Sequence, residues 1–268
     1  MTMRMTGTIV ALLAVWVATA GAQGAKPLKK CPDDSVVSAT VCMDKYEASV
    51  WRVPNATTSG ASVVKKIQSG KASASDLQAA GATQLGVALD DFAPCDNNGQ
   101  NCADDIFAVS LPGVTPSAHI TWFQAQAACR NARKRLPSNA EWQSAVMGTP
   151  DPGPDNGTTD CNSLTGAAVA TGSRASCVSV DGAFDMVGNV YEWVADWVPR
   201  SSACGTWGIG TSPTNDSQCL AGALTTGQPG AIIRGGYFGN GSVAGPFTIF
   251  GSVEPAVASN NTGLRCAR

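Results

Sequence analysis

The residues with the greatest capacity for chemistry in this sequence are ten cysteines and a single histidine, His119. Thiolates act as nucleophiles and as ligands of soft metals, and pairs of thiols form disulfides. No two cysteines stand in a Cys-x-x-Cys spacing, so the main sequence signal of zinc ribbons and thioredoxin-like sites is missing. One histidine cannot build a histidine-rich iron, copper or zinc site. Because no nucleophile partner is visible for His119, we interpret it as structural or exposed rather than catalytic.

A second candidate for chemistry is the oxygen-rich turn between Asp185 and Glu192, which contains the dipeptide Gly188-Asn189. A hard cation such as calcium binds several carboxylate and carbonyl oxygens, and this turn can supply both kinds. The alternative is that the two acids cap a turn beside Trp193. The polar segment 96–105 loosely resembles a calcium loop, but it lacks the glutamate that closes an EF-hand. We interpret it as a solvated loop pinned by a disulfide.

The N-terminus has the three-part form of a secretory signal over residues 1–20, with cleavage near 20–22. Arg4 precedes an apolar run from Ile9 to Val17, and small residues follow at 18–20. This run is too short to span a bilayer, so we expect a secreted or periplasmic protein without a membrane span. In an exported chain, an even number of cysteines favours disulfides over metal clusters or reduced thiols.

The composition favours a loop-rich extracellular fold. Charged residues make up only 14% of the chain, glycine occurs 29 times, and the net charge is -2. Without a basic run, nucleic acid and anionic membranes are poor candidate partners. The chain is predicted to form a single domain over 26–268, with an insertion at about 54–116 that is poor in large apolar residues.

Local patterns predict the elements that would position these residues. Residues 41–47 alternate as an opening strand does, and the segment 54–116 holds a short helix near 75–80. Two capping boxes, Thr121 with Gln124 and Ser138 with Glu141, predict the starts of two helices, the second ending at Gly148. Two further strands are predicted near 231–237 and 263–268.

Five blocks in order along the chain resemble the formylglycine-generating enzyme family, also called the sulfatase-modifying factor family. They lie at residues 44–47, 120–129, 134–142, 182–193, and 233–236 with 263–266. The resemblance implies an α+β fold of the C-type-lectin-like kind. Such a fold has two helices, short antiparallel strands, much irregular structure and chain ends that lie together.

The resemblance also implies a disulfide between Cys129 in the first predicted helix and Cys266 near the C-terminus. Closing so long a loop restricts the unfolded chain strongly in the chain-entropy model. The remaining cysteines fall into local neighbours, which suggests the pairs Cys31 with Cys42, Cys95 with Cys102, Cys161 with Cys177, and Cys204 with Cys219.

Family members carry a structural calcium, and the resemblance places its ligands at Asp185, Gly188, Val190 and Glu192. Two of these would bind through side chains and two through backbone carbonyls. A second family site is eroded: Asn162 can be placed, but residues 171–173, Thr-Gly-Ser, stand where an aspartate is expected.

Active members bind copper(I) through two cysteines that stand five positions apart after a Gly-Gly turn, and they oxidise a substrate cysteine with oxygen. Aligning Gly235-Gly236 with that turn places Asn240 and Gly245 at the cysteine positions. Neither residue supplies a thiolate, so no catalytic residue is assigned and bound copper is not expected.

These features favour an exported, calcium-stabilised binding module that has lost the family chemistry, a pseudoenzyme. Its ligand would be an exported protein, a peptide or a glycan, bound in a groove around Tyr237, Phe238, Asn240, Phe247 and Phe250. The alternative for these aromatic residues is that they are the packed underside of a loop. The competing function is a family oxidoreductase that acts on a cysteine of an exported protein, which would require free thiols.

Overall fold

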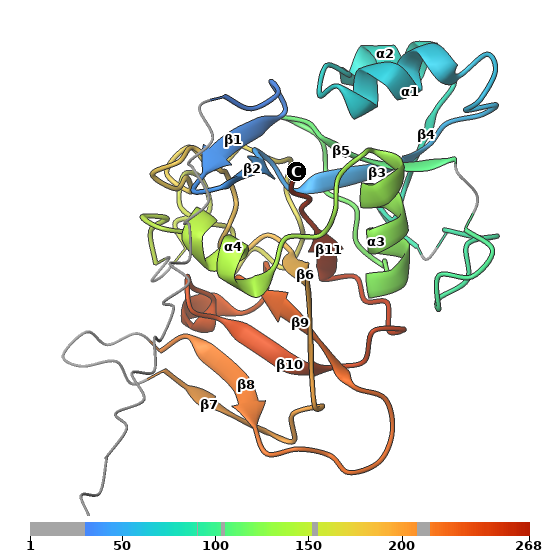
Figure 1. Ribbon diagram of the computed structural model, residues 1–268. Coiled ribbons are helices and arrows are strands. Elements are labelled where there is room, and N and C mark those ends of the chain that lie inside the picture. The colour runs from blue at the N-terminus through green and yellow to red at the C-terminus, as the bar shows by residue number, and fades with distance from the viewer. Residues whose placement is uncertain (1–29, 90, 103–104, 152–154, 208–214) are drawn as a thin grey trace, which may run out of the picture.

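A computed structural model describes residues 30–268 apart from 90, 103–104, 152–154 and 208–214 (Figure 1). The predicted signal at 1–20 lies outside the described residues. The strands form three sheets with two, six and three members, and the four α-helices of the described residues pack around them. No helix in this part of the chain is long and apolar enough to cross a membrane. The predicted α+β fold is therefore confirmed.

The first strands bring the start of the described chain to its end. Strands β1 (Ser35–Ser38) and β2 (Val41–Asp44) form an antiparallel hairpin. Cys42 and Arg268 exchange two backbone hydrogen bonds of 2.9 and 2.8 Å. The strand predicted over 41–47 ends at Asp44, because the chain bends there before β3 begins.

The structure divides the segment 54–116, which the sequence suggests as an insertion, into two parts. Helices α1 (Ala61–Gln68) and α2 (Ala74–Ala79) pack as a separate cluster over the three-stranded sheet, at one end of the molecule (Figure 1). Strands β4 (Thr83–Leu85) and β5 (Ile106–Ser110) flank β3 (Ala48–Arg52) and bury side chains in the main core. The part from Thr83 onward thus contributes strands to the main core, whereas the helical part packs in a cluster of its own with β3 and β5.

The two predicted capping boxes begin helices as expected. In α3 (Trp122–Asn131) and α4 (Asn139–Ala145), the N-cap hydroxyl accepts from the N3 backbone N–H, and the N3 side chain accepts from the N-cap N–H. Helix α4 ends three residues before Gly148, at Ala145. Its N-terminus is held further by Asp196, whose carboxylate accepts from the Asn139 N–H at 2.6 Å.

The six-stranded sheet carries the region of the family motifs. Its order is β11-β6-β9-β10-β8-β7. The sheet is mixed rather than purely antiparallel, because β11 pairs with β6, and β10 with β8, in parallel. In this sheet Glu192 on β6 lies opposite Arg234 on β9. The bounds are β6 (Tyr191–Val198), β7 (Ala203–Thr206), β8 (Ser217–Ala221), β9 (Gly230–Arg234), β10 (Ile249–Val253) and β11 (Thr262–Leu264).

All ten cysteines lie within the described residues, and the structure pairs them as predicted. Cys129 of α3 is joined to Cys266, 137 residues away, and both side chains are fully buried in the core. The other pairs are local: Cys31–Cys42, Cys95–Cys102, Cys161–Cys177 and Cys204–Cys219. The cysteines therefore cross-link the fold and leave no free thiol among these residues.

Candidate functional site

The turn predicted to bind calcium begins at a buried carboxylate. Asp185 is 1% exposed and has a left-handed backbone, with φ of 57°. Its Oδ2 accepts from the Gly172 N–H at 2.6 Å, and its Oδ1 is buried without a hydrogen-bond partner in the described structure. Buried polar atoms normally have partners, so this free oxygen is the feature of the turn that fits a cation.

Glu192, at the other end of the turn, is already committed to protein groups. Its Oε1 accepts from Arg265 Nη2 at 2.8 Å, and its Oε2 accepts from Trp142 Nε1 at 2.6 Å. Arg265 is fully buried and also donates to the carbonyls of Asp44 and Phe184. A guanidinium therefore neutralises the carboxylate that was predicted as a calcium ligand.

A third buried acid, Glu47, joins this site and received no role from the sequence. Its carboxylate accepts hydrogen bonds from the Val190 N–H at 3.0 Å and from the Asn189 side chain, so it holds two residues of the turn in place. Burial, followed by the charges of Asp185 and Glu192, raises its pKa well above the ordinary value. Glu47 closes the family block at 44–47, which was the available signal.

The net charge of the cluster is negative when its acids are ionised, which favours a bound cation. Three buried acids, Glu47, Asp185 and Glu192, surround one guanidinium, Arg265. Fully ionised, these four side chains sum to two negative charges, and burial raises the pKa of Asp185 to about 6. No group of three or more His, Cys, Asp or Glu in the described residues is placed to hold a metal ion. The fit to calcium is therefore partial: Asp185 offers a free oxygen, but Glu192 does not.

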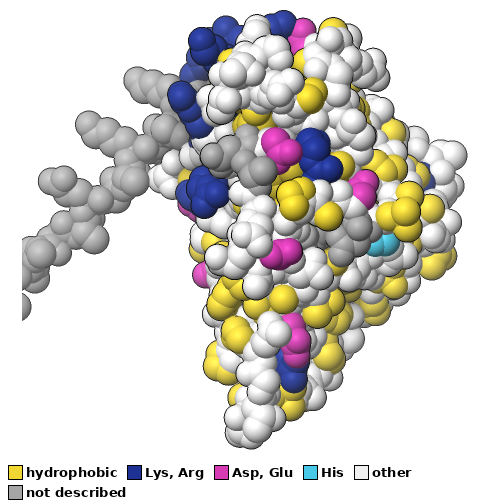
Figure 2. Space-filling model, turned by 90° about the vertical axis from the view of Figure 1, so that its right-hand side faces the viewer, with side chains coloured by type: hydrophobic (Ala, Val, Ile, Leu, Met, Phe, Trp, Pro, Cys, Tyr) yellow, Lys and Arg dark blue, Asp and Glu magenta, His cyan; other side chains and the backbone are white. Residues whose placement is uncertain are grey.

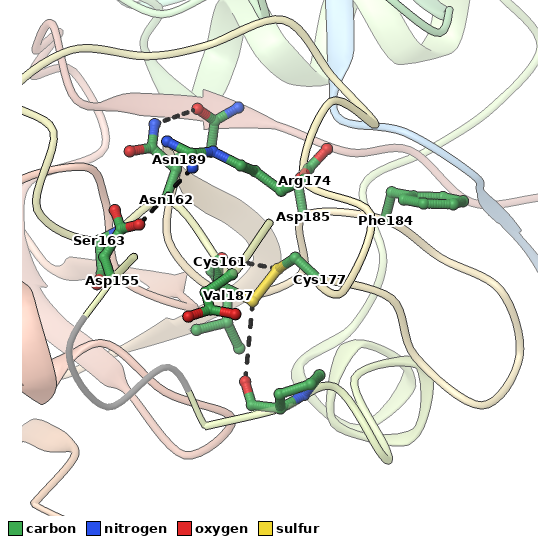
Figure 3. Close-up of a disulfide and its surroundings, with 12 residues drawn as sticks. Asp155, Cys161, Asn162, Ser163, Arg174, Cys177, Phe184, Asp185, Val187 and Asn189 are labelled. Carbon is green, nitrogen blue, oxygen red and sulfur yellow. Dashed lines mark hydrogen bonds and ion pairs between the residues drawn. A yellow bond between two sulfur atoms is a disulfide. The ribbon is translucent and has the colours of Figure 1, made fainter. Parts of the chain in front are cut away.

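The region predicted to be an eroded second calcium site contains a buried arginine. Asn162 donates to Asn189 Oδ1 at 2.9 Å, and its own Oδ1 accepts from Thr165. The Arg174 guanidinium, 4% exposed, lies 3.7 Å from the Asp155 carboxylate. Figure 3 shows these polar groups gathered next to the Cys161–Cys177 disulfide. A buried arginine thus supplies positive charge to this region.

The two family cysteine positions lie in the chain after β9. Asn240 precedes the short 3-10 turn η1 (Gly241–Val243), and its Oδ1 accepts from the Tyr237 N–H at 3.0 Å. Gly245 is fully enclosed: any Cβ added there would collide with the carboxyl group of Asp216. The space next to the position aligned with the second family cysteine is therefore occupied by Asp216, the residue just before β8.

Asp216 is a functional candidate that sequence reasoning missed. Its side chain is fully buried, its Oδ2 accepts from the Phe247 N–H at 2.7 Å, and its Oδ1 has no partner in the described residues. Burial raises its pKa to about 6, with a further increase from Asp151 and opposition from the Phe247 N–H and Arg234. No local motif marks Asp216, because its contact with Gly245 is made across 29 residues of sequence.

The five predicted groove residues do not line one common hollow. Tyr237 and Phe250 pack against Tyr191, with ring centroids 5.3 and 5.4 Å apart, so they belong to the edge of the core. Phe238 lines a cleft of about 260 Å³ together with His119, which is half-buried with φ of 51°. Phe247 lines a separate cavity of about 350 Å³. Phe238 and Phe247 therefore lie at two separate hollows, and Tyr237 and Phe250 lie in an aromatic cluster with Tyr191.

The sequence of this chain is similar to those of two curated proteins. The chain is 28% identical over 173 residues to the formylglycine-generating enzyme of Streptomyces coelicolor, covering 57% of this chain and 52% of that protein. It is 34% identical over 87 residues to the serine/threonine-protein kinase Pkn1 of Chlamydia trachomatis, covering 31% and 14%. The chain thus spans about half the length, or less, of the curated relatives it matches.

Two solved structures resemble it at low identity. The first is PvdO from Pseudomonas aeruginosa, with 16% identity, a TM-score of 0.40, and a match that covers 89% of this chain and 86% of that chain. The second is a Major Tropism Determinant I1 variant, with 16% identity, a TM-score of 0.48, and a match that covers 91% of this chain and 55% of that chain. The family model described as "Sulfatase-modifying factor enzyme 1-like domain" matches residues 85–268. Because that match spans well over half of the sequence, the chain belongs to the sulfatase-modifying factor family, as its five motif blocks suggested.

Proposed function

We propose that this protein is an exported, non-catalytic member of the family that binds a protein, peptide or glycan ligand. The observation that carries the proposal is the replacement of the second family cysteine by Gly245, with the Asp216 carboxylate filling the space. A thiolate at that position would need both a new side chain and the displacement of this carboxylate. Export is supported by the five disulfides, which persist in oxidising compartments.

The family oxidation depends on two thiolates that hold copper(I), because soft sulfur ligands suit that ion. Here Asn240 offers only an amide, and Gly245 offers no side chain. All ten cysteines are committed to disulfides, so no thiol elsewhere in the described residues takes over. Among the hollows of the described surface, two lie near the predicted binding region, beside Phe238 and beside Phe247. Concave surfaces are the usual places where ligands bind.

Thiol titration tests the loss of chemistry directly. We expect the purified, unreduced protein to show no reactive thiol and to leave a Cys-x-Pro-x-Arg peptide unconverted in the presence of copper. The same protein, reduced and denatured, should yield all ten thiols, which controls for the reagent. Conversion of the cysteine to an aldehyde, detected by mass spectrometry, would refute the proposal and establish the competing oxidoreductase function.

We further propose that the buried acids bind one calcium ion through Asp185. The support is the free Oδ1 of Asp185 and the net charge of the four buried ions. Calcium should then raise the melting temperature relative to a chelator, by linkage of about 2.7 kcal/mol at a concentration about 100 times the dissociation constant. The shift should shrink from about pH 7.5 to about pH 5, because protons compete for a carboxylate whose pKa is about 6.

Differential scanning calorimetry with calcium, with magnesium and with chelator measures these shifts. Magnesium is the matched control, since its smaller ion demands near-ideal octahedral geometry. A melting temperature that is the same in calcium and chelator at both pH values would refute the proposed calcium site.

A further inference from the structure

The apolar cavity beside Phe247 lies next to the vacated family position. Its walls come from the end of α4 and the turn after it, and from the two residues that directly follow Gly245; they are Gln143, Val146, Met147, Gly148, Pro246 and Phe247. Met147 and neighbouring Val180 are exposed by 63% and 72%, and Val180 packs over Gly148. Hydrophobic side chains are also exposed among charged ones on another face of the molecule, which Figure 2 shows from the side of α3. The cavity and its rim therefore suit an apolar side chain.

An unsatisfied carboxylate stands directly behind this cavity. The Phe247 N–H donates to Asp216 Oδ2, so the backbone of the cavity wall holds the acid in place. Its Oδ1 is buried with no hydrogen-bond partner in the described residues. A buried acceptor without a donor is costly, and a charged donor makes the strongest hydrogen bonds to a carboxylate.

The charges around Asp216 leave it available to an incoming cation. Asp151 adds negative charge to the same region. Arg234 is close enough to act on Asp216 electrostatically, but its guanidinium donates elsewhere, to Gln143 Oε1, to Pro246 O and to Asn139 Oδ1. It also stacks on Trp142, 4.3 Å from the ring centroid. The cation nearest the acid is thus bound to the cavity wall and the helix rather than to the carboxylate.

We propose that Asp216 and the adjacent cavity form a peptide-binding site for a lysine or arginine side chain followed by an apolar side chain. The cation satisfies Asp216 Oδ1, and the apolar side chain enters the cavity between Met147 and Phe247. Because Asp216 is buried in the free protein, its carboxylate must become accessible when the cation binds; the adjacent residue, Asn215, is exposed and donates a hydrogen bond to Ser242. The inference rests on the proposed function, since it names the ligand class of the same non-catalytic surface.

Fluorescence anisotropy with the full-length protein and labelled hexapeptides tests this inference. Three peptides share one sequence and differ only in a central Lys-Leu, Gln-Leu or Lys-Ser pair. We expect the Lys-Leu peptide to bind at least about tenfold more tightly than either of the others. The Gln-Leu peptide lacks the charged contact, and the Lys-Ser peptide lacks the apolar contact. In Asp216→Asn the preference for Lys over Gln should vanish. Asp33→Asn, the same change at an exposed acid before β1, should retain it.

The variant itself should fold well, which keeps the test interpretable. Asp216 has a higher pKa in the folded protein than in the unfolded chain. Its contribution to folding stability is therefore fully present below the unfolded pKa and is lost as the pH rises through about 6. The ionised Asp216 therefore costs stability at about pH 7.5, and Asp216→Asn should melt higher there than wild type and about equally at about pH 4.

Three results would overturn the inference: equal affinities of the wild type for the Lys-Leu and Gln-Leu peptides, a Lys preference that survives in Asp216→Asn, or no binding of any peptide at millimolar concentration. None of them changes the outcome of the thiol and conversion assays. A failure of this ligand class is therefore distinguishable from a failure of the non-catalytic function.

Discussion

Replacing Arg265 with methionine is expected to lower the free energy of unfolding by about 3–5 kcal/mol, the cost of breaking a buried ion pair on one side. The side chain is fully buried, and it pairs with Glu192 while donating to the carbonyls of Asp44 and Phe184. Without it, the acids at 47, 185 and 192 lose their buried counter-charge, and two carbonyls lose their donors. Methionine keeps much of the volume, so the loss measures charge and hydrogen bonding rather than a cavity.

Urea unfolding at neutral pH measures this loss. Arg130→Met, at an exposed site at the end of α3, is the matched control and should change stability by no more than about 0.5 kcal/mol. Adding Glu192→Gln to Arg265→Met should restore part of the loss, because one unpaired buried charge is then removed. If Arg265→Met is as stable as the control, the buried acids are neutralised by protons rather than by the guanidinium.

Removing the disulfide between Cys129 and Cys266 by a double alanine substitution should cost about 5 kcal/mol in the chain-entropy model. The bond closes a loop across 137 residues and ties α3 to the segment after β11. The Cys95–Cys102 bond spans only 7 residues, and its removal should cost about 2.5 kcal/mol in the same model. The long bond is therefore expected to contribute about twice as much as the short one.

Denaturant unfolding of the two double variants, compared with wild type, checks this ratio. The short-loop variant serves as the control for the chemical change itself, since both lose two sulfurs. A long-loop variant no less stable than the short-loop variant would mean that the unfolded chain already holds α3 near the C-terminal segment.

The elements that the sequence predicts best are those whose signals are local. Thr121 with Gln124 and Ser138 with Glu141 each form a complete capping box within four residues, and both helices begin there. Helix α1 was missed because Gly60 at its N-cap provides no side-chain acceptor. Its remaining signal is Val63 and Ile67, which lie one turn apart and are both buried.

The parts of the site that the sequence could not predict are contacts between distant residues. Glu192 has the oxygens of a calcium ligand, but its partner Arg265 is 73 residues away, and nothing near Glu192 indicates that pairing. The same holds for Asp216, which occupies the space next to Gly245. The arrangement of the predicted groove residues was also beyond the sequence: aromatic residues close in sequence contact different neighbours, Phe247 the ring of Trp207 and Phe250 the ring of Tyr191.

The position of Trp142 gives the protein a built-in optical reporter. Its indole N–H is bound to Glu192, its ring lies against Arg234, and Arg234 holds Gln143 and Pro246 of the cavity wall. Indole emission responds to nearby charges and hydrogen bonds. Occupancy of the cavity and neutralisation of the buried acids should therefore both change the fluorescence of Trp142. The difference spectrum between wild type and Trp142→Phe isolates this signal from the other six tryptophans of the chain, so both events can be followed without attaching a dye.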